Sequence, residues 1–263
     1  MKQSVLISSI VVSLLAVVCI GCQKQEATDA AAEDLSRQQI TDIEVGEGIE
    51  AVAGDLAVVH YTGWLWVAGA KGHKFDSSHD RREPFSFVLD AGGVIDGWDQ
   101  GVVGMKVGGK RNLRIPPDLA YGNTDNRDIP ANSALFFEVE LIAVPRVQIE
   151  DLFVGEGPLA EDGDTVSVLY TGWLFVDGER GTQFDSSTER NQPTTFDIGQ
   201  GQVIRGWDQG MVGMKVGGKR ILTIPPLLAY GARGRLGRDG KALIPPHAAI
   251  QLELELLHVM GKQ

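Results

Sequence analysis

The sequence repeats itself once at a fixed offset, and this repeat constrains the fold more than any other feature. YTGW occurs at 61–64 and again at 170–173, and FDSS occurs at 75–78 and 184–187. GWDQG and VGMKVGGKR follow in both halves, with every pair 109 residues apart. A unit of this length exceeds the roughly 20–50 residues of solenoid repeats and matches the size of an independently folding domain. We therefore predict two tandem copies of one domain.

The N-terminus differs in composition from both repeats. Residues 1–21 combine an early Lys2 with an apolar run from Val5 to Ile20, which is typical of a signal peptide and short for a membrane span of roughly 20 apolar residues. The stretch VCIGC ending at Cys22 resembles the lipobox of bacterial lipoproteins. This resemblance implies that Cys22 is lipidated and anchors the chain in a bilayer. The alternative is an ordinary signal peptide in which Cys22 is incidental.

The predicted mature chain begins with a tether. Cys22 would be its only thiol, because Cys19 would leave with the signal peptide, so no intramolecular disulfide is expected. Residues 22–39 are polar and too poor in large apolar side chains to fold alone. Asp after the lipidated Cys favours inner-membrane retention in the lipoprotein pattern, and Gln23 stands there instead. We therefore favour the outer membrane of a bacterial cell envelope. The first domain is placed at 40–145 and the second at 146–260.

Composition excludes several classes of function. A hydrophobic fraction of 43% fits a folded globular chain, and a formal net charge of −11 would repel a phosphate backbone, so no nucleic-acid partner is expected. The sequence has neither a Gly-x-Ser-x-Gly elbow nor a spaced pair of zinc ligands. His60 is replaced by Leu169 in the second copy, which argues against a catalytic histidine. Neither a metal nor a cofactor is predicted.

Hydrophobic periodicity predicts strands around one short helix in each copy. Apolar residues alternate with polar ones through 135–141 and 250–256, as in strands with one solvated face. Apolar side chains between Ile95 and Val103 recur at helical spacing, and Gly108-Gly109 then leads into a strand over 110–115. The Lys-Arg pairs at 110–111 and 219–220 are predicted to lie on the exposed side of their strands.

Six motifs follow one another in the same order in both copies: YTG, FDSS, VI-x-GWDQG, a basic strand, AYG and an Ile-Pro loop. In this order they resemble the FK506-binding-protein (FKBP) family of peptidyl-prolyl cis/trans isomerases, over roughly residues 43–258. The resemblance implies an α+β fold of two tandem FKBP-like domains. Each would be a twisted antiparallel β-sheet wrapped over one short α-helix, with an apolar pocket that accepts a proline ring.

The chemistry of such a pocket can be stated from first principles. Rotation about an X–Pro imide must cross about 18–20 kcal/mol because resonance is lost, and no bond to an atom is broken. Neither nucleophile nor metal is needed. A water-poor site that holds the ring, favours the twisted imide and donates to a nearby carbonyl suffices. An acceleration of about four decades requires roughly 5.5 kcal/mol.

In the first copy, the resemblance places one residue at the pocket floor, Trp98, and two donors, a backbone N–H at the helix start and the hydroxyl of Tyr121. Asp76 would lie against Tyr61 and be neutralised by Arg81. Taken singly, each aromatic is more simply a core residue, and Asp76-Ser77-Ser78 could be only a capped turn. The predicted site residues are Tyr61, Phe75, Asp76, Phe85, Val94, Ile95, Trp98, Tyr121, Ile129 and Phe137.

The second copy departs from the first at two walls and one loop. Thr194 replaces Phe85 and Leu252 replaces Phe137, while the Tyr230-to-Ile244 segment is fourteen residues long against eight in the first copy. That loop carries Arg233, Arg235, Arg238 and Lys241. A solvated surface loop is the favoured interpretation, and recruitment of acidic client segments is the alternative. The predicted binding residues are Tyr170, Phe184, Asp185, Val203, Ile204, Trp207, Tyr230, Ile244 and Leu252.

The leading hypothesis is a lipid-anchored tandem prolyl isomerase that acts on proline-containing segments of folding envelope or secreted proteins. The first copy is expected to be the better isomerase, because its aromatic wall is intact. The alternative is a non-catalytic chaperone or adaptor that grips polypeptide with the same grooves, and two weak sites on one connector would suit it. A scaffold with degenerate pockets is a third possibility that fits the second copy better than the first.

Overall fold

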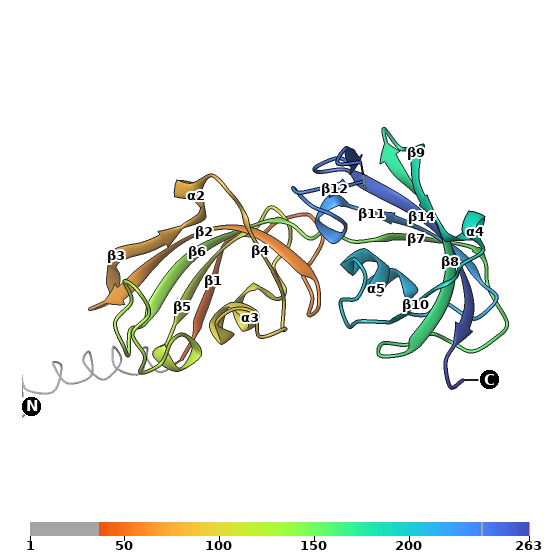
Figure 1. Cartoon of the computed structure of the whole chain (residues 1–263). Coiled ribbons are helices and arrows are strands. Elements are labelled where there is room, and N and C mark those ends of the chain that lie inside the picture. The colour runs from red at the N-terminus through yellow and green to blue at the C-terminus, as the bar shows by residue number, and fades with distance from the viewer. Residues whose placement is uncertain (1–36, 238, 263) are drawn as a thin grey trace, which may run out of the picture.

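The computed structural model describes residues 37–237 and 239–262. The predicted signal peptide, Cys22 and most of the predicted tether lie outside the described residues. Two domains follow one another along the chain, and in each a curved sheet wraps around a short helix (Figure 1). Among the helices of the described residues, none has the length and apolar character needed to cross a bilayer.

Domain 1 is a six-stranded antiparallel sheet with the order β1-β5-β6-β2-β3, in which β4 also pairs with β2. Three short helices lie between the strands. The elements are β1 (Gln39–Glu44), β2 (Leu56–Val67), β3 (Ala70–Ser77), α2 (Ser78–Arg81), β4 (Phe85–Val88), α3 (Asp96–Val102), β5 (Lys110–Ile115), the 3-10 helix η1 (Pro117–Leu119) and β6 (Leu135–Ala143).

Domain 2 repeats this plan with the order β10-β8-β14-β11-β7, in which β9 also pairs with β8. Its elements are β7 (Gln148–Phe153), β8 (Thr165–Val176), β9 (Glu179–Ser186), α4 (Ser187–Arg190), β10 (Thr194–Asp197), α5 (Arg205–Met211), β11 (Lys219–Ile224), the 3-10 helix η2 (Pro226–Leu228) and β14 (Ala249–Val259). A two-stranded hairpin, β12 (Arg235–Leu236) and β13 (Ala242–Ile244), is added in the long loop. The α+β prediction of two tandem sheet-over-helix domains is confirmed.

The start of domain 1 lies slightly before the predicted position. Gln39 already pairs with Arg114 in the sheet, and the Gln38 amide donates a hydrogen bond of 2.6 Å to the Gly97 carbonyl. Both residues belong to the segment predicted to be a tether. Strand pairing and a helix contact therefore hold the last two residues of that segment against the domain.

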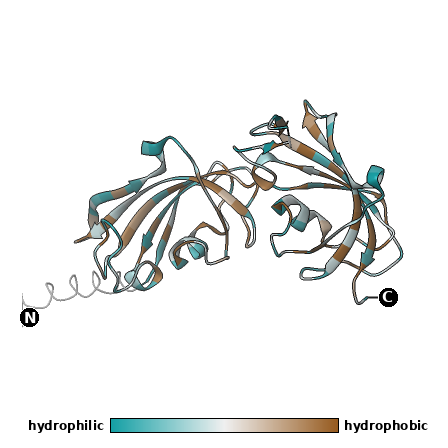
Figure 2. Ribbon diagram, viewed as in Figure 1, coloured by the Kyte–Doolittle hydropathy of each residue, from teal (hydrophilic) through white to brown (hydrophobic). Residues whose placement is uncertain are grey.

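Hydrophobic and hydrophilic residues are interspersed along the strands of each sheet (Figure 2), so that apolar side chains point to one face, the face that packs against the helix. In β6, Leu135, Phe137, Val139 and Leu141 are buried, while Glu138 is exposed. Buried side chains of α3, Trp98 and Val102, pack in the same core cluster. Each buried aliphatic or aromatic side chain of this kind contributes about 1.5–3 kcal/mol to folding. The apolar contact between sheet and helix therefore holds the concave face in shape.

Glycine allows the helix to approach the sheet. A Cβ on Gly97 would lie 2.4 Å from the Ile115 side chain, and one on Gly206 in domain 2 would lie 2.3 Å from Ile224. Contacts this short do not occur between real side-chain atoms, so any larger residue would push the helix away. The glycine of the GWDQG motif is thus required by packing in both domains.

The prediction that both members of each Lys-Arg pair lie on an exposed strand face is wrong for the arginines. Arg111 is only 9% exposed and donates hydrogen bonds to Asp42 at 2.6 Å and to the carbonyls of Gly101 and Val103 at 2.8 and 3.1 Å. Arg220 makes the equivalent bonds in domain 2. The last carbonyls of a helix lack intrahelical donors, and the arginine supplies them. It fastens the end of the helix to the sheet.

The two domains meet at a small apolar contact. Leu56 of domain 1 is 8% exposed and belongs to the core cluster of domain 2, and Val88, its partner across β2 and β4, packs against that cluster. On the domain 1 side of the connector, Arg146 donates to Asp55 at 2.7 Å and to the Glu50 carbonyl at 2.9 Å. These contacts fix the connector to the first domain.

Candidate functional site

A cavity of about 240 Å³ opens in domain 1 between the concave face of the sheet and the start of α3. All the residues predicted for this site except Ile129 line it, together with Gly93. Ile129 is 6% exposed and lines an adjoining cavity that shares Phe75, Asp76 and Tyr121. The lining consists of Tyr61, Phe75, Asp76, Phe85, Gly93, Val94, Ile95, Trp98, Tyr121 and Phe137.

The floor of this cavity is the indole of Trp98, which is 4% exposed. The ring of Tyr61 stands edge-on to it at 4.9 Å between centroids, Phe137 does so at 5.2 Å and Phe85 at 6.0 Å. Edge-to-face pairs of this kind contribute about 0.5–1.5 kcal/mol each beyond their burial. The indole Nε1 is buried and has no hydrogen-bond partner among the described residues. The rings therefore form a rigid apolar cup.

One wall of the cup carries an ion pair, Asp76 with Arg81, and both residues also hydrogen-bond to Tyr61. The Tyr61 hydroxyl donates to Asp76, and Arg81 donates both to Asp76 and, at 3.0 Å, to the Tyr61 oxygen. Partial burial acts to raise the pKa of Asp76, but the hydrogen bonds from Tyr61 and Arg81 outweigh it and hold that pKa below its usual value. Burial and the Asp76 hydrogen bond raise the pKa of Tyr61. The carboxylate stays ionised and neutralised, so it is unsuited to act as a general base.

The start of α3 brings backbone donors to the cavity. Ile95 is the N-cap, and no side chain caps the helix there. The N–H groups of Trp98 and Asp99 donate to the Ile95 carbonyl at 2.8 and 3.3 Å, which leaves those of Ile95, Asp96 and Gly97 without a backbone acceptor among the described residues. Asp99 accepts from the backbone N–H of Asp90 at 3.0 Å and of Gly92 at 2.9 Å, which fixes the loop that leads to Val94. A polar backbone edge is thus held at the rim of an otherwise apolar cavity.

Tyr121 follows η1 and lies on the same cavity as Trp98, with 37% of its surface exposed. Its hydroxyl has no hydrogen-bond partner among the described residues. Burial, with a smaller effect from the negative charge of Asp76, raises the pKa of Tyr121 above its usual value. The phenol therefore remains a neutral O–H donor at physiological pH.

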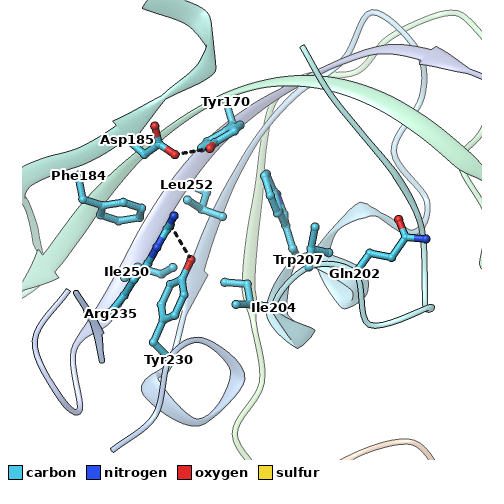
Figure 3. A pocket seen from close by; sticks show the side chains of 11 residues that line it. Tyr170, Phe184, Asp185, Gln202, Ile204, Trp207, Tyr230, Arg235, Ile250 and Leu252 are labelled. Atoms are coloured by element: carbon cyan, nitrogen blue, oxygen red, sulfur yellow. Dashed lines mark hydrogen bonds between the residues drawn. The ribbon is translucent and has the colours of Figure 1, made fainter. Parts of the chain in front are cut away.

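Domain 2 holds the equivalent cavity, larger at about 390 Å³ (Figure 3). Of the residues predicted there, Ile244 lies outside the lining, in the core at 1% exposure, and the others line the cavity. Sequence reasoning missed Gln202 and Ile250, and it named Arg235 only as one of the basic residues of the long loop. The lining consists of Tyr170, Phe184, Asp185, Gln202, Val203, Ile204, Trp207, Tyr230, Arg235, Ile250 and Leu252.

The larger volume follows from the two substitutions. Trp207 keeps Tyr170 edge-on at 4.9 Å, but Thr194 and Leu252 offer it no ring where domain 1 has Phe85 and Phe137. Arg190 donates to Asp185 at 2.6 Å, and Tyr170 donates to the same carboxylate, as in domain 1. Burial and the hydrogen bond to Asp185 raise the pKa of Tyr170 to about 12. Domain 2 thus keeps the floor and the ion pair and loses two aromatic walls.

The long loop of domain 2 folds back over its cavity. Arg235 on β12 donates to the Tyr230 hydroxyl at 3.4 Å, and its guanidinium lies 5.8 Å from the centre of that ring (Figure 3). Arg235 is exposed, as the favoured interpretation of a solvated surface loop expects, and it also lines the cavity. Nothing in the local sequence separates Arg235 from Arg233 or Lys241, because the hairpin has no alternating apolar pattern.

No group of three or more His, Cys, Asp or Glu side chains in the described part of the chain is arranged to hold a metal ion. The donors at the domain 1 cavity are backbone N–H groups and the Tyr121 hydroxyl, and the domain 2 cavity adds the guanidinium of Arg235. The neutral donors and apolar rings can bind and orient an uncharged segment of polypeptide.

A curved antiparallel sheet that encloses an aromatic-floored cavity with a short helix defines a class of small polypeptide-binding domain, present here twice. The chain belongs to the family described as FKBP-type peptidyl-prolyl cis-trans isomerase, whose model matches residues 47–142 and 157–257. The family prediction made from the six motifs is confirmed. Each match contains one complete cavity floor, Trp98 in the first and Trp207 in the second.

The chain is similar to other proteins of this family. Peptidyl-prolyl cis-trans isomerase FKBP9 of Homo sapiens is 40% identical over 199 residues, which cover 72% of this chain and 33% of that protein. FK506-binding protein of Neisseria meningitidis serogroup A is 55% identical over 111 residues, 42% of this chain and 94% of the relative. The solved structure of AtFKBP13 has 42% identity and a TM-score of 0.38, covering 43% of this chain and 92% of that one. The chain spans about a third of human FKBP9.

Proposed function

We propose that the protein is a peptidyl-prolyl cis-trans isomerase that accelerates rotation about X–Pro imides without covalent chemistry. The observation that carries this proposal is that Trp98, Tyr121 and the start of α3 all border one cavity in domain 1. An apolar floor and two kinds of neutral donor are the groups that a twisting imide requires.

The mechanism follows from the positions of these groups. A proline ring rests on Trp98, enclosed by Tyr61, Phe85 and Phe137, and this enclosure removes water from the imide. Loss of resonance makes the nitrogen pyramidal, and an environment of low polarity favours that less dipolar state over the planar one. The Tyr121 hydroxyl and a backbone N–H at Ile95 then donate to carbonyls beside the imide and hold them while the bond turns.

Domain 1 is proposed to be the more efficient site. Trp98 contacts the rings of Tyr61, Phe85, Phe87 and Phe137, whereas Trp207 contacts only those of Tyr170 and Phe196 among the described residues. The smaller, ring-walled cavity encloses a proline ring more completely. Tighter enclosure excludes more water and fixes the imide more firmly.

A chaperone or adaptor function is the second candidate, and domain 2 favours it. Its cavity of about 390 Å³ against about 240 Å³ in domain 1 accepts larger apolar side chains and encloses a proline ring less closely. Two such sites on one chain raise the effective concentration of the second once the first is occupied. In this case domain 2 would bind polypeptide without accelerating rotation about X–Pro imides to a similar degree.

The anchor and location rest on the sequence alone. Lipidation of Cys22 after removal of residues 1–21 would attach the chain to a bilayer of the bacterial envelope, with the outer membrane favoured. Proline-containing segments of folding envelope or secreted proteins would then be the clients. Mass spectrometry of the mature N-terminus tests this: a mass without added acyl groups on Cys22 would reject it.

A protease-free isomerisation assay on a proline peptide tests the enzymatic proposal. The full chain should accelerate exchange, and Trp98→Leu should remove most of the acceleration while circular dichroism still reports a folded sheet. The matched substitution in domain 2, Trp207→Leu, should remove a smaller part of the acceleration. If the full chain suppresses aggregation of an unfolded client without accelerating exchange, the chaperone function replaces the isomerase.

A further inference from the structure

We propose that the domain 2 cavity selects prolines preceded by an acidic residue, and that Arg235 is the specificity-determining residue. This inference rests on the proposed function, because it assigns a substrate class to one of the two proline sites. Domain 1, which has no equivalent of the β12–β13 hairpin, would not share the preference.

The first observation is the place of Arg235. The hairpin projects it from the loop onto the cavity lining, where its guanidinium donates at 3.4 Å to the Tyr230 hydroxyl (Figure 3). In this arrangement the Tyr230 oxygen accepts, so its own O–H proton is still available to a ligand. The remaining guanidinium N–H groups are also available, since a guanidinium carries five donors.

The second observation is that no carboxylate among the described residues neutralises the positive charge of Arg235. Asp185 and Arg235 are the two charged residues of the lining, and Asp185 is already held by Arg190 at 2.6 Å and by the Tyr170 hydroxyl. Arg235 forms no salt bridge with any described residue. Gln202, which also lines the cavity, donates from its amide to Asp197 at 2.8 Å. The cavity therefore presents one unpaired cation.

Domain 1 differs in charge at the corresponding place. Its loop places Arg127 beside Asp128 on the adjoining cavity, and both share that lining with Asp76. One cation thus shares that lining with two carboxylates. With a formal net charge of −11, the protein as a whole repels an acidic peptide, so any preference for one must arise locally. Arg235 is the residue placed to provide it.

The arrangement of Trp207, Tyr230 and Arg235 would bring the side chain of the residue before the proline close to Arg235. With the proline ring on Trp207, the imide carbonyl belongs to the preceding residue and is the acceptor that the Tyr230 hydroxyl would meet. The side chain of that residue then starts beside Tyr230, where Arg235 lies. A Glu carboxylate can accept from the guanidinium in the fork geometry that arginine offers.

Binding at each cavity can be measured separately in the full chain. The indole N–H signals of Trp98 and Trp207 in ¹H–¹⁵N spectra report the two floors, and Trp→Phe variants assign them. Two capped peptides, Ala-Glu-Pro-Phe and Ala-Gln-Pro-Phe, differ only in the charge before proline. At the Trp207 signal we expect the Glu peptide to bind about threefold to fivefold more tightly than the Gln peptide, in the range of a half-exposed ion pair. At the Trp98 signal we expect no such preference.

Variants of exposed loop residues separate charge from fold. Arg235→Gln should abolish the preference at Trp207, Arg235→Lys should retain part of it, and Arg233→Gln, outside the lining, should leave it unchanged. Raising the salt concentration should weaken it, because half-exposed charges are screened. Exchange spectroscopy on the same peptides should show the same ordering in the rate of isomerisation attributable to domain 2.

The outcomes are distinct. Equal affinities of the two peptides, measured at the Trp207 signal, would overturn the specificity and leave the proposed function standing. A Trp207 signal that moves with neither peptide would overturn both for domain 2. A preference that survives Arg235→Gln would overturn the role of Arg235.

Discussion

Removal of one oxygen atom at Tyr121 tests the proposed mechanism most directly. The hydroxyl borders the cavity and bonds to no described residue, so Tyr121→Phe leaves no buried partner unsatisfied. The side chain is 37% exposed and its ring stays in place. Substitutions of this kind change the free energy of unfolding by no more than about 0.5 kcal/mol. Any larger effect on the isomerisation rate therefore belongs to the chemistry.

The size of that effect can be worked out. A neutral hydrogen bond contributes about 0.5–1.5 kcal/mol net, and 1.36 kcal/mol corresponds to a factor of ten in rate. If the bond forms fully only as the imide twists, kcat/KM of domain 1 should fall about twofold to thirteenfold. Loss of a bond that forms equally in the ground state and the transition state would raise KM and leave kcat unchanged. The separate values of kcat and KM thus show when the bond forms.

The assay uses cis/trans exchange of a proline peptide on the full chain, with Tyr121→Phe, Tyr230→Phe and the double variant. Because the two sites act on the same peptide, their contributions add, and the double variant removes both hydroxyls. Tyr121→Phe should account for the larger part of the loss. The reasoning is refuted if the double variant keeps kcat/KM within about 1.5-fold of the parent, since even the weakest hydrogen bond considered would exceed that.

Three further predictions concern the frame around the sites. Gly97→Ala should lower the free energy of unfolding of domain 1 by about 1–3 kcal/mol in chemical denaturation, because the new Cβ would lie 2.4 Å from Ile115. Gly93→Ala is the control and should leave the helix in place, because its Cβ would meet no atom within 4 Å. Arg111→Gln should lower the free energy of unfolding by about 1.5–3 kcal/mol, because it removes charged hydrogen bonds to Asp42 and the helix carbonyls. Lys110→Gln, at an exposed position, is the control and should change that free energy by no more than about 0.5 kcal/mol. The lowered pKa of Asp76 means that its ionised form is stabilised by folding, so this contribution is present above the unfolded value of 3.8 and is lost as pH falls through the lower folded pKa. The difference in Tm between the parent and Asp76→Asn should accordingly be constant near neutral pH and shrink below pH 3.8; a difference that shrinks between pH 6 and 8 would contradict the assignment.

The frame of the fold was accessible from sequence because its signals are periodic and repeated. The spacing of Ile95, Trp98 and Val102 predicted a helix at the position of α3, and the alternation through 135–141 predicted β6. Both patterns depend on which face of an element is buried, and burial leaves a direct trace in residue type. Recognition of the ordered motifs then indicated which of the buried aromatics border a cavity.

The errors share a physical cause. Arg111 was placed on an exposed face because isolated charges are normally solvated, and its real partners, the carbonyls of Gly101 and Val103, are backbone groups that sequence does not display. Arg235 is exposed, as a surface loop predicts, but its place at the cavity is not visible in the sequence, because a two-residue strand has too few positions to show alternation. In each case the position of a long polar side chain depends on tertiary contacts rather than on its neighbours in the chain.

The duplication separates what the fold requires from what the site can vary. Each domain keeps the glycine under its helix, the buried arginine at the helix end and the Tyr-Asp-Arg ion pair, which hold the helix against the sheet, the end of the helix and one wall of the cavity. The differences lie on the rim, at two wall positions and in one loop insertion, where a substitution alters volume or charge without disturbing the sheet. A chain with a fixed floor and variable rims can thus present two proline sites of different selectivity, one enclosed by rings and one marked by a cation.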